Sequence, residues 1–339
     1  MSTLAAPARR PLPWRLDCHL PADAREAMAA EVRRGLGDRP RWLLPKWFYD
    51  ARGCALFEAI TELPEYYQTR TELGILRARA AGVVARHRPT ELVELGSGSS
   101  RKTRALLDAM AAADGVRRYV PFDVSPGAIL DAAGPLAEAY PGMRVHGVAG
   151  DFERHLRHVP RRPRGGRRLV AFLGGTIGNI HPVNRAPFLH AVGGLLRPGD
   201  RLLMGTDLVG DRARLEAAYD DAAGVTAEFN RNIVRVLNDA LGGDADPHAF
   251  AHVARFDEDR AWIEMRLRAT RDVAWRLDAL GVVEHIAAGE EIRTEISCKF
   301  TRASAEAMYA EAGLRLLEWH TDAEGRFAVS VAAPHGDAR

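Results

Sequence analysis

A glycine-rich turn with the sequence Glu-Leu-Gly-Ser-Gly-Ser-Ser (94–100) lies between an apolar stretch and a segment of helical character. Glycine lets the backbone approach a ligand closely, and the N-terminus of the following helix favours negative charge. A dinucleotide site usually has the pattern G-x-G-x-x-G, whereas here Arg101 occupies the third glycine's position. The turn formed by Gly96 and Gly98 therefore indicates a nucleotide-like ligand that lacks a pyrophosphate.

Two aspartates follow this turn at the ends of the next two predicted strands. Asp123, in "PFDVS", is placed to accept hydrogen bonds from ribose hydroxyls, and Asp151, in "AGDF", to accept one from an adenine amine. Phe152 is placed to cover the adenine ring. Acceptors in this order are typical of the S-adenosylmethionine (AdoMet) pocket of class I methyltransferases. Both aspartates can also cap the helices that follow them, and the two roles can coexist.

The elements that must position these residues alternate between strand and helix up to about residue 209. A helix is predicted from Arg101, and Ser-Pro at 125–126 is a favourable start for the next one. This alternation is typical of a doubly wound parallel sheet. The predicted strands span residues 91–96, 118–124, 144–151, 168–175 and 201–208.

After residue 210 the pattern changes. Helices are predicted at 211–222 and 225–241, and the segment 261–269 alternates as an antiparallel, half-exposed strand does. Further strands are expected at 272–277 and 292–300. The remainder of the chain predicts a helix and then a hairpin, which closes the large sheet with an antiparallel edge.

We therefore expect an α/β fold with a class I methyltransferase, Rossmann-like sheet that ends in an antiparallel hairpin, plus an inserted α+β domain. The methyltransferase domain would comprise residues 71–209 and 300–334, and the substrate-binding domain residues 18–70 and 210–299. Residues 1–17 are rich in Ala, Pro and Arg, which predicts a flexible N-terminus.

Composition narrows the class of protein further. The 339 residues carry a net charge of +2, so no global field points to nucleic acid or an anionic membrane. Cys18, Cys54 and Cys298 are far apart and have no metal-ligand spacing, so no metal is expected. Neither a signal peptide nor a run of about 18 apolar residues is present, which predicts a cytoplasmic protein.

Four segments resemble the histidine-specific AdoMet-dependent methyltransferases, the enzymes that make hercynine for ergothioneine biosynthesis. The resemblance covers roughly residues 18–334, and it implies three successive methyl transfers from AdoMet to the α-amine of L-histidine. The segments that carry it are "PKWFYDARGCALFEAITELPEYYQTR" (45–70), "ELGSGSSRKT" (94–103), "FLGGTIGNI" (172–180) and "EISCKF" (295–300).

The resemblance also implies a set of site residues, and each position holds the residue type that the family pattern expects. The AdoMet site would use Gly96, Lys102, Asp123, Asp151 and Phe152. The substrate site would use Tyr49, which is also the expected catalytic residue, Tyr66, Asn179, Tyr219, Met265, Glu295 and Ser297.

Residue chemistry agrees with these assignments. Glu295 and Ser297 are two positions apart, so in an extended strand both project to one face, where a carboxylate and a hydroxyl suit the two nitrogens of an imidazole. The simpler alternative is an edge strand whose polar face meets water. Asn179 offers an acceptor for the amine and a donor for the carboxylate, and the Tyr219 hydroxyl can donate.

The amine must be neutral in order to attack a sulfonium. No dedicated base stands out in the sequence, so we expect Tyr49 to orient the amine and to pass protons to water, with positioning supplying most of the acceleration. Packing is the simpler interpretation for the aromatic residues Tyr49 and Tyr66, and also for Met265, which shares a strand face with apolar neighbours.

Other functions remain open at this stage. The substrate could be another aromatic amino acid or a histidine-like amine. The basic run at 157–168 would serve an RNA methyltransferase as a phosphate contact, although its prolines and glycines favour a solvated loop. A non-catalytic AdoMet-binding regulator is the third alternative. The expected partner is L-histidine, with no nucleic acid or membrane, and the expected state is a monomer.

Overall fold

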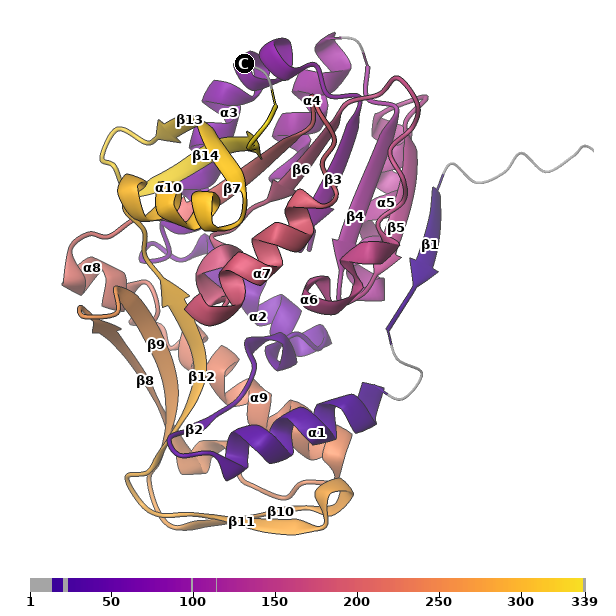
Figure 1. The fold of residues 1–339 in the computed structure, drawn as a ribbon. Coiled ribbons are helices and arrows are strands. Elements are labelled where there is room, and N and C mark those ends of the chain that lie inside the picture. The colour runs from indigo at the N-terminus through magenta and orange to yellow at the C-terminus, as the bar shows by residue number, and fades with distance from the viewer. Residues whose placement is uncertain (1–13, 21–23, 99, 114, 338–339) are drawn as a thin grey trace, which may run out of the picture.

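The computed structural model describes residues 14–20, 24–98, 100–113 and 115–337. An eight-stranded sheet with the order β1-β5-β4-β3-β6-β7-β14-β13 forms its upper part (Figure 1). Neighbouring strands run parallel from β1 to β7, and the last two, β14 and β13, are antiparallel. The strands are β1 (Trp14–Cys18), β3 (Glu91–Leu95), β4 (Arg118–Asp123), β5 (Arg144–Ala149), β6 (Arg168–Phe172), β7 (Arg201–Asp207), β13 (Leu314–Thr321) and β14 (Phe327–Pro334).

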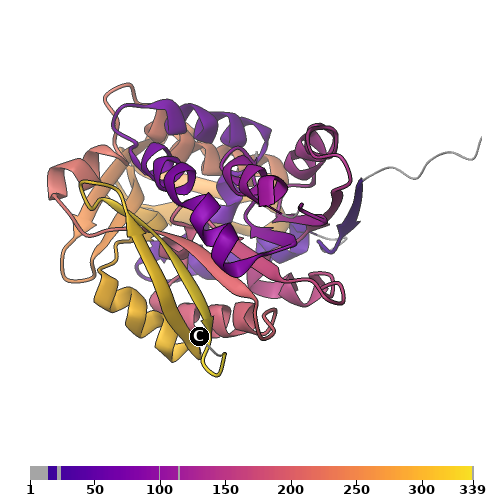
Figure 2. The same cartoon turned by 90° about the horizontal axis from the view of Figure 1, so that it is seen from above.

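Helices cover both faces of this sheet (Figure 2). Successive strand residues point to opposite faces, so Leu92 packs in one core and Val93 in another. The first core is closed by α3 (Gln68–His87), α4 (Thr103–Ala113) and α5 (Pro126–Ala139). The opposite face carries α7 (Pro182–Gly193) and α10 (Arg302–Glu311), with α6 (Phe152–His155) and the 3₁₀ segment η2 (Leu156–His158) beside them.

The strand order reverses direction at β3, which has β4 on one side and β6 on the other. In open α/β sheets, ligands bind at such a switch point, beyond the carboxyl ends of the strands. The glycine turn at 96–98 follows β3 directly. The topology therefore places this turn where a ligand is expected.

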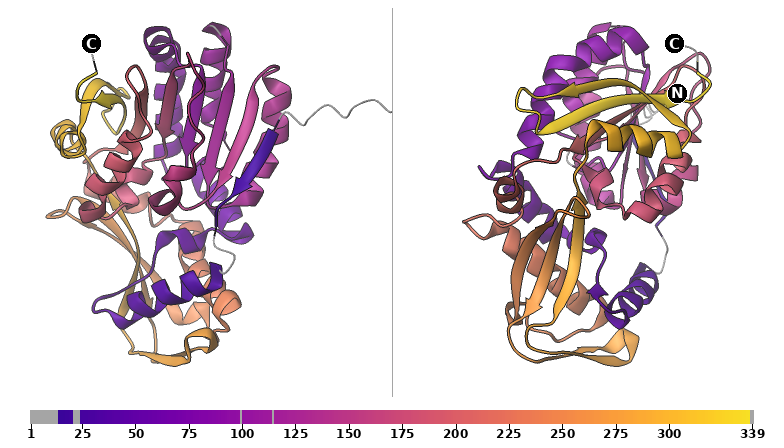
Figure 3. Two further views of the ribbon diagram at one scale, coloured as in Figure 1. Left: turned by 45° about the vertical axis from the view of Figure 1, so that its right-hand side comes forward. Right: turned by 60° about the vertical axis from the view of Figure 1, so that its left-hand side comes forward.

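A second, four-stranded sheet with the order β2-β12-β9-β8 lies below the first (Figure 3). Its strands are β2 (Arg41–Trp42), β8 (Phe250–Asp257), β9 (Trp262–Ala269) and β12 (Glu291–Cys298), and β10 (Val273–Leu277) pairs with β11 (Val282–Ile286) in a separate hairpin. Its helical elements are α1 (Ala24–Gly37), α2 (Ala51–Glu62), α8 (Arg212–Ala217) and α9 (Val225–Leu241), with the 3₁₀ segments η1 (Pro45–Phe48), η4 (Pro247–Ala249) and η5 (Asp278–Leu280).

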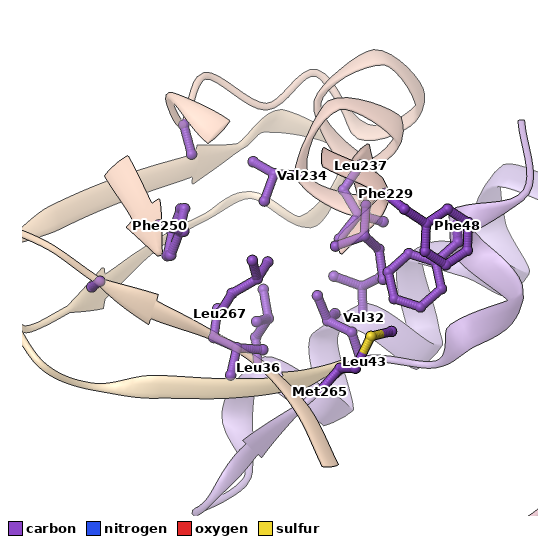
Figure 4. Close-up of a cluster of buried hydrophobic side chains, with 14 of the residues drawn as sticks. Val32, Leu36, Leu43, Phe48, Phe229, Val234, Leu237, Phe250, Met265 and Leu267 are labelled. Carbon is purple, nitrogen blue, oxygen red and sulfur yellow. The ribbon is translucent and has the colours of Figure 1, made fainter. Parts of the chain in front are cut away.

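The four-stranded sheet, the β10–β11 hairpin and these helical elements form a second unit below the large sheet. Its core brings together segments that are far apart in sequence (Figure 4). Leu36 of α1, Leu237 of α9 and Leu267 of β9 are fully buried in one apolar cluster. In α9 the apolar residues recur at helical spacing, so one face of the helix is buried against the sheet. Burial of this face holds the N-terminal helix α1 to strands from the second half of the chain.

Most of the predicted elements are present, and α9 has the predicted bounds. The N-terminus differs from the expectation, because residues 14–17 belong to β1, which pairs in parallel with β5 at the edge of the large sheet. Residues 1–13 lie outside the described part. The α3 helix, which begins at Gln68, packs against the large sheet. The domain boundaries at 70, 209 and 299 stay our interpretation of these packing patterns.

Strand β9 is antiparallel as predicted, but the expectation that it is half-exposed is wrong. Both of its faces are buried apart from Arg268, and Glu264 and Arg266 are 3% and 9% exposed. The reason is charge pairing, because Arg266 donates to Glu264 at 2.6 Å and also lies 3.3 Å from Glu291 on β12. Paired charges tolerate burial that single charges do not.

A β-bulge in β12 sets the direction of the predicted ring-binding residues. Ile292 pairs with Leu267 and Glu295 pairs with Met265, and the register shifts between Arg293 and Glu295. Because cross-strand partners share a face, the bulge places Ile292 and Glu295 on one face although they are three positions apart. The apolar core and the carboxylate are thus built on the same side of one strand.

Gly178 allows the 3₁₀ segment η3 (Thr176–Asn179) to lie against β12. A Cβ at this position would lie 2.7 Å from the carbonyl oxygen of Cys298. We expect Gly178→Ala to lower the free energy of unfolding by about 1–3 kcal/mol, because backbone must move to relieve the overlap. Thermal unfolding measures the change.

Gly82→Ala is the matched control, since Gly82 lies on the exposed side of α3 with nothing within 4 Å of an added Cβ. It should raise stability by about 0.5–1 kcal/mol through better helix propensity. A Gly178→Ala protein as stable as the control would show that η3 and β12 are not tightly packed.

Candidate active site

One cavity of about 1180 Å³ lies between the carboxyl ends of the parallel strands and the second unit. All of the site residues predicted from the sequence line this cavity, at both its cofactor end and its substrate end. Its volume is larger than that of a typical pocket for one small ligand. The cavity is therefore large enough to bring a nucleotide-like ligand and a second small molecule together.

The glycine turn forms the nucleotide end of the cavity. Gly96 and Gly98 have φ angles of 71° and 47°, a left-handed conformation that residues other than glycine rarely adopt. The amide of Gly98 donates to Asp123 Oδ2 at 2.8 Å, and the amide of Ser125 donates to Oδ1 at 2.9 Å. Burial raises the pKa of the Asp123 carboxyl. These bonds fix the carboxylate at the end of β4, where each oxygen keeps a lone pair for a ribose hydroxyl.

Asp151 and Phe152 follow β5 and form the predicted adenine end. Asp151 caps α6 by accepting from the Glu153 amide at 2.9 Å, and it also pairs with Lys46 of η1 at 3.0 Å. The capping role is thus present, and an adenine amine would share the carboxylate with Lys46. Phe152 packs edge-on against Phe172, with ring centroids 5.4 Å apart.

Lys102 lies just before α4 and already has a partner. Its Nζ is 2.5 Å from Glu72 of α3, a fully buried carboxylate that also accepts from the Gly174 amide at 2.9 Å. An ammonium has three N–H groups, so Lys102 can hold Glu72 and still donate to a ligand carboxylate. Glu72 is not among the residues predicted from the sequence, and it fixes where the Lys102 charge lies.

Aromatic rings form one wall of the substrate end. Tyr49, Phe57, Tyr66 and Tyr219 follow one another with centroid distances of 5.8, 6.2 and 6.4 Å. Desolvation raises the pKa of Tyr49 and of Tyr66 well above the usual value, although Tyr49 is 37% exposed where it lines the cavity, so both remain neutral phenols at physiological pH. Among the described residues, neither hydroxyl has a protein hydrogen-bond partner, so both are free to bind a ligand.

Asn179, the last residue of η3, connects the two units. Its amide nitrogen donates to Glu295 Oε1 at 3.0 Å and to the Ile296 carbonyl at 2.8 Å. A carbonyl only accepts, so this bond fixes the orientation of the amide. Asn179 therefore presents its Oδ1 atom to the cavity as an acceptor, and its expected second role, donation to a carboxylate, is not provided by this geometry.

Glu295 faces the same cavity from β12. Burial raises the pKa of Glu295 to about 7, against the opposing effects of the Lys299 charge and the Asn179 hydrogen bond. Met265, its partner across the β-ladder, is 2% exposed and both packs in the core and lines the cavity. The packing interpretation and the cavity interpretation of Met265 thus both hold.

Ser297 and Tyr219 bind each other and a buried lysine. Tyr219 donates to Ser297 Oγ at 2.7 Å, and Lys299 Nζ lies 2.9 Å from the same Oγ and 3.0 Å from Tyr219 Oη. Lys299 also pairs with Asp207 at 2.8 Å. The Tyr219 proton is therefore used within the protein, unlike the expected donation to a substrate carboxylate.

Lys299 and Asp207 are not among the residues predicted from the sequence, although both have a recognisable signal. Asp207 ends β7 and continues the series of carboxylates at the ends of parallel strands, as Asp123 does at the end of β4 and Asp151 does just after β5. Lys299 continues the alternation that begins with Glu295 and Ser297. The first pattern indicates Asp207, and the second indicates Lys299.

No group of three or more His, Cys, Asp or Glu residues in the described part of the chain could hold a metal ion. Among the same residues, no helix combines the length and the apolar character that crossing a bilayer requires.

The glycine turn, the strand-end carboxylates and a parallel sheet with an antiparallel last pair define a class I AdoMet-dependent methyltransferase. More narrowly, the chain belongs to the family of histidine-specific, SAM-dependent methyltransferases, whose sequence model matches residues 28–334.

Curated relatives extend over nearly the whole chain. It is 52% identical to the histidine N-alpha-methyltransferase of Mycolicibacterium smegmatis, over 93% of this chain and 97% of that protein. It is 51% identical to the protein of the same name from Mycobacterium tuberculosis, over 93% of this chain and 98% of that one. Ergothioneine biosynthesis protein 1 of Neurospora crassa is 31% identical over 83% of this chain, which spans 32% of that larger protein.

The raised pKa of Glu295, about 7 against an ordinary value of 4.5, has a consequence for stability. Between these values the folded protein holds a proton that the unfolded chain releases, so stability falls as pH rises through this window. Glu295→Gln removes the effect and keeps the acceptor for Asn179. We expect the variant to be more stable than wild type by about 1–3 kcal/mol at pH 8, with the gain shrinking toward pH 5.

Urea unfolding at the two pH values measures this difference, and Glu306→Gln on the exposed side of α10 is the matched control. A stabilisation by Glu295→Gln of the same size at pH 5 and pH 8 would contradict a buried carboxylate with a raised pKa.

Proposed function

We propose that the protein is an L-histidine Nα-methyltransferase that makes three successive methyl transfers from AdoMet to the α-amine of L-histidine. The product is hercynine, the betaine of histidine, for ergothioneine biosynthesis. The observation that carries this proposal is the single cavity in which the strand-end acceptors for AdoMet meet the paired Glu295 and Ser297. The 52% identity to a histidine N-alpha-methyltransferase over nearly the whole chain supports the same reaction.

The imidazole would bind between Glu295 and Ser297. Glu295 keeps one oxygen, Oε2, that the described residues do not engage, since Asn179 holds the other. This oxygen can accept from a ring N–H, and the Ser297 hydroxyl can bond the second ring nitrogen. A site built to bond polar groups rejects ligands that lack them, because its own groups would be left unpaired.

The α-amine would lie near Asn179 and Tyr49. Asn179 Oδ1 is an acceptor fixed by the other two bonds of its amide group, so it orients an N–H of the amine. Tyr49 remains a neutral phenol because desolvation raises its pKa, so it does not act as a phenolate base. Its hydroxyl orients the amine, and the proton passes to water in the cavity. Positioning then supplies most of the acceleration.

The aromatic wall explains how the site holds a substrate that changes with each transfer. Every methylation replaces an N–H with a methyl group, and the final trimethylammonium has no donor at all. Aromatic faces attract such cations. Tyr49, Phe57 and Tyr66 form a row that lines the same cavity as Asn179 and would offer these faces to the amine as its hydrogen bonds disappear.

The proposal includes a monomer that acts in the cytoplasm on a small molecule, without nucleic acid or a membrane. One observation supports the absence of a nucleic-acid role. In the basic run at 157–168, Arg162 is paired with Asp200 at 2.6 Å and Arg168 with Glu91 at 2.7 Å. These two charges stabilise the sheet and are not free to bind phosphates.

Mass spectrometry of L-histidine incubated with the protein and AdoMet tests the reaction. We expect trimethylated histidine as the end product, with little product from tyrosine, tryptophan or histamine run in parallel. Histamine is the sharpest comparison, because it keeps the imidazole and the amine but lacks the carboxylate. AdoMet binding without any methylated histidine would overturn the proposed substrate and leave the fold assignment intact.

Tyr49→Phe tests how the amine is oriented. The change removes one hydroxyl from the cavity and keeps the ring contacts with Phe57 and Phe229. We expect the second and third transfers to slow by about tenfold, the scale of one lost hydrogen bond, so that mono- and dimethylated histidine accumulate. Single-turnover rates report each step. Unchanged rates for all three would exclude a role for this hydroxyl.

A further inference from the structure

Lys299 is a fully buried cation beneath the ring-binding end of the cavity. Its side chain is 0% exposed, and it follows β12 directly. It does not line the cavity itself, but it contacts Ser297 and Tyr219, which do. The reaction proposed above requires no cation at this place, so its burial calls for a reason.

Every hydrogen of the Lys299 ammonium has an acceptor. The three partners are Asp207 Oδ2 at 2.8 Å, Ser297 Oγ at 2.9 Å and Tyr219 Oη at 3.0 Å. An ammonium has three N–H groups and no lone pair, so the direction of all three bonds is fixed. Ser297 and Tyr219 must both accept from Lys299.

The hydroxyl hydrogen of Ser297 is the only part of this group that remains for a ligand. Its oxygen accepts from Lys299 and also from the Tyr219 hydroxyl, at 2.7 Å. Burial raises the pKa of Tyr219 well above its usual value, so this phenol keeps the proton that it donates. A hydroxyl has two lone pairs and one hydrogen. With both lone pairs used, Ser297 faces the cavity as a donor.

Glu295, in contrast, offers the ligand a hydrogen-bond acceptor. Asn179 donates to its Oε1 atom, and its Oε2 atom is an acceptor toward the cavity when the carboxyl is ionised. The two side chains therefore present one acceptor and one donor. A neutral imidazole, with one N–H and one bare nitrogen, is the complement of this pair. An imidazolium carries two N–H groups, and one of them would meet the Ser297 hydrogen.

We propose that Lys299 is a positioning residue that fixes Ser297 as a hydrogen-bond donor, so that the site selects a neutral ring with one N–H and one bare nitrogen. This inference rests on the proposed function and deepens it. Without Lys299, the Tyr219 oxygen loses its donor, and the Ser297 proton can turn toward it and away from the ring. Selectivity for the bare nitrogen then weakens.

Two pyrrolylalanines provide the test, because each replaces one ring nitrogen of histidine with carbon. Their dissociation constants and that of L-histidine are measured by calorimetry in the presence of S-adenosylhomocysteine, the demethylated product of AdoMet. The tighter-binding isomer is the one that keeps its N–H toward Glu295, so it reports on Ser297. For wild type we expect it to bind about tenfold or more weakly than L-histidine, since the Ser297 proton loses its acceptor.

The variants separate positioning from simple structural support. Lys299→Met should reduce the preference for L-histidine over the pyrrole by about tenfold, mainly through weaker histidine binding. Ser297→Ala should remove the same preference. If Lys299 acts through Ser297, the double variant should match Ser297→Ala, because coupled residues do not add. Ser330→Ala, which removes a buried serine hydroxyl bonded to Tyr309 away from the cavity, should leave the preference unchanged.

A folding defect in Lys299→Met would be avoided by the pair Lys299→Met/Asp207→Asn, which removes both charges of the ion pair together. Binding of S-adenosylhomocysteine verifies that either protein is folded. An equal loss of affinity for histidine and pyrrole would overturn the inference, as would an unchanged preference in both lysine variants. Failure of wild type to methylate histidine would instead reject the proposed function, which these binding ratios do not measure.

Discussion

The ion pair between Lys299 and Asp207 is the interaction on which the site depends. Asp207 ends β7 of the large sheet and Lys299 follows β12 of the second sheet, and both are buried. Backbone joins the two at the same point, where the Phe300 amide donates to the Asp207 carbonyl at 2.8 Å. Tyr67, just before α3, donates to the same carboxylate. Leaving one partner of such a pair unpaired costs about 3–5 kcal/mol, so this junction holds the two halves of the cavity in register.

The substrate end of the site lowers the stability of the folded protein. Glu295 is buried with a raised pKa, and the bulge in β12 turns it away from the regular alternation of the strand. A carboxylate that must bind a ring N–H needs these features, because a water-exposed one would already be hydrogen-bonded to solvent. Asn179 compensates in part by donating to Glu295. The Asn179 amide group thus serves both parts of the substrate: its nitrogen holds Glu295 for the ring, and its oxygen orients the amine.

The fold, the strand-end residues and the Glu295/Ser297 pair follow from local sequence patterns, and the other site residues follow from the family resemblance. The polarity of the hydrogen bonds in the site follows from neither. Alternating strands and helices place Gly96 and Asp123 at one edge of the sheet, and the spacing of Glu295 and Ser297 places them on one face. The burial of β9 could not be predicted, because it depends on Arg266 pairing with Glu264 of the same strand and with Glu291 of the neighbouring strand β12. The direction of the Tyr219 hydroxyl depends on Lys299, which the structure brings to it.

The most direct test of this account is the protonation state of the bound ring. Nitrogen-15 NMR of labelled L-histidine, bound together with S-adenosylhomocysteine at pH 8, distinguishes a bare ring nitrogen from a protonated one. At this pH Glu295, with its pKa raised to about 7, is ionised, and a negative carboxylate beside a ring nitrogen by itself favours the doubly protonated imidazolium. We predict a neutral bound ring in a single tautomer, with one bare nitrogen facing Ser297. A bound ring that carries protons on both nitrogens would contradict the account.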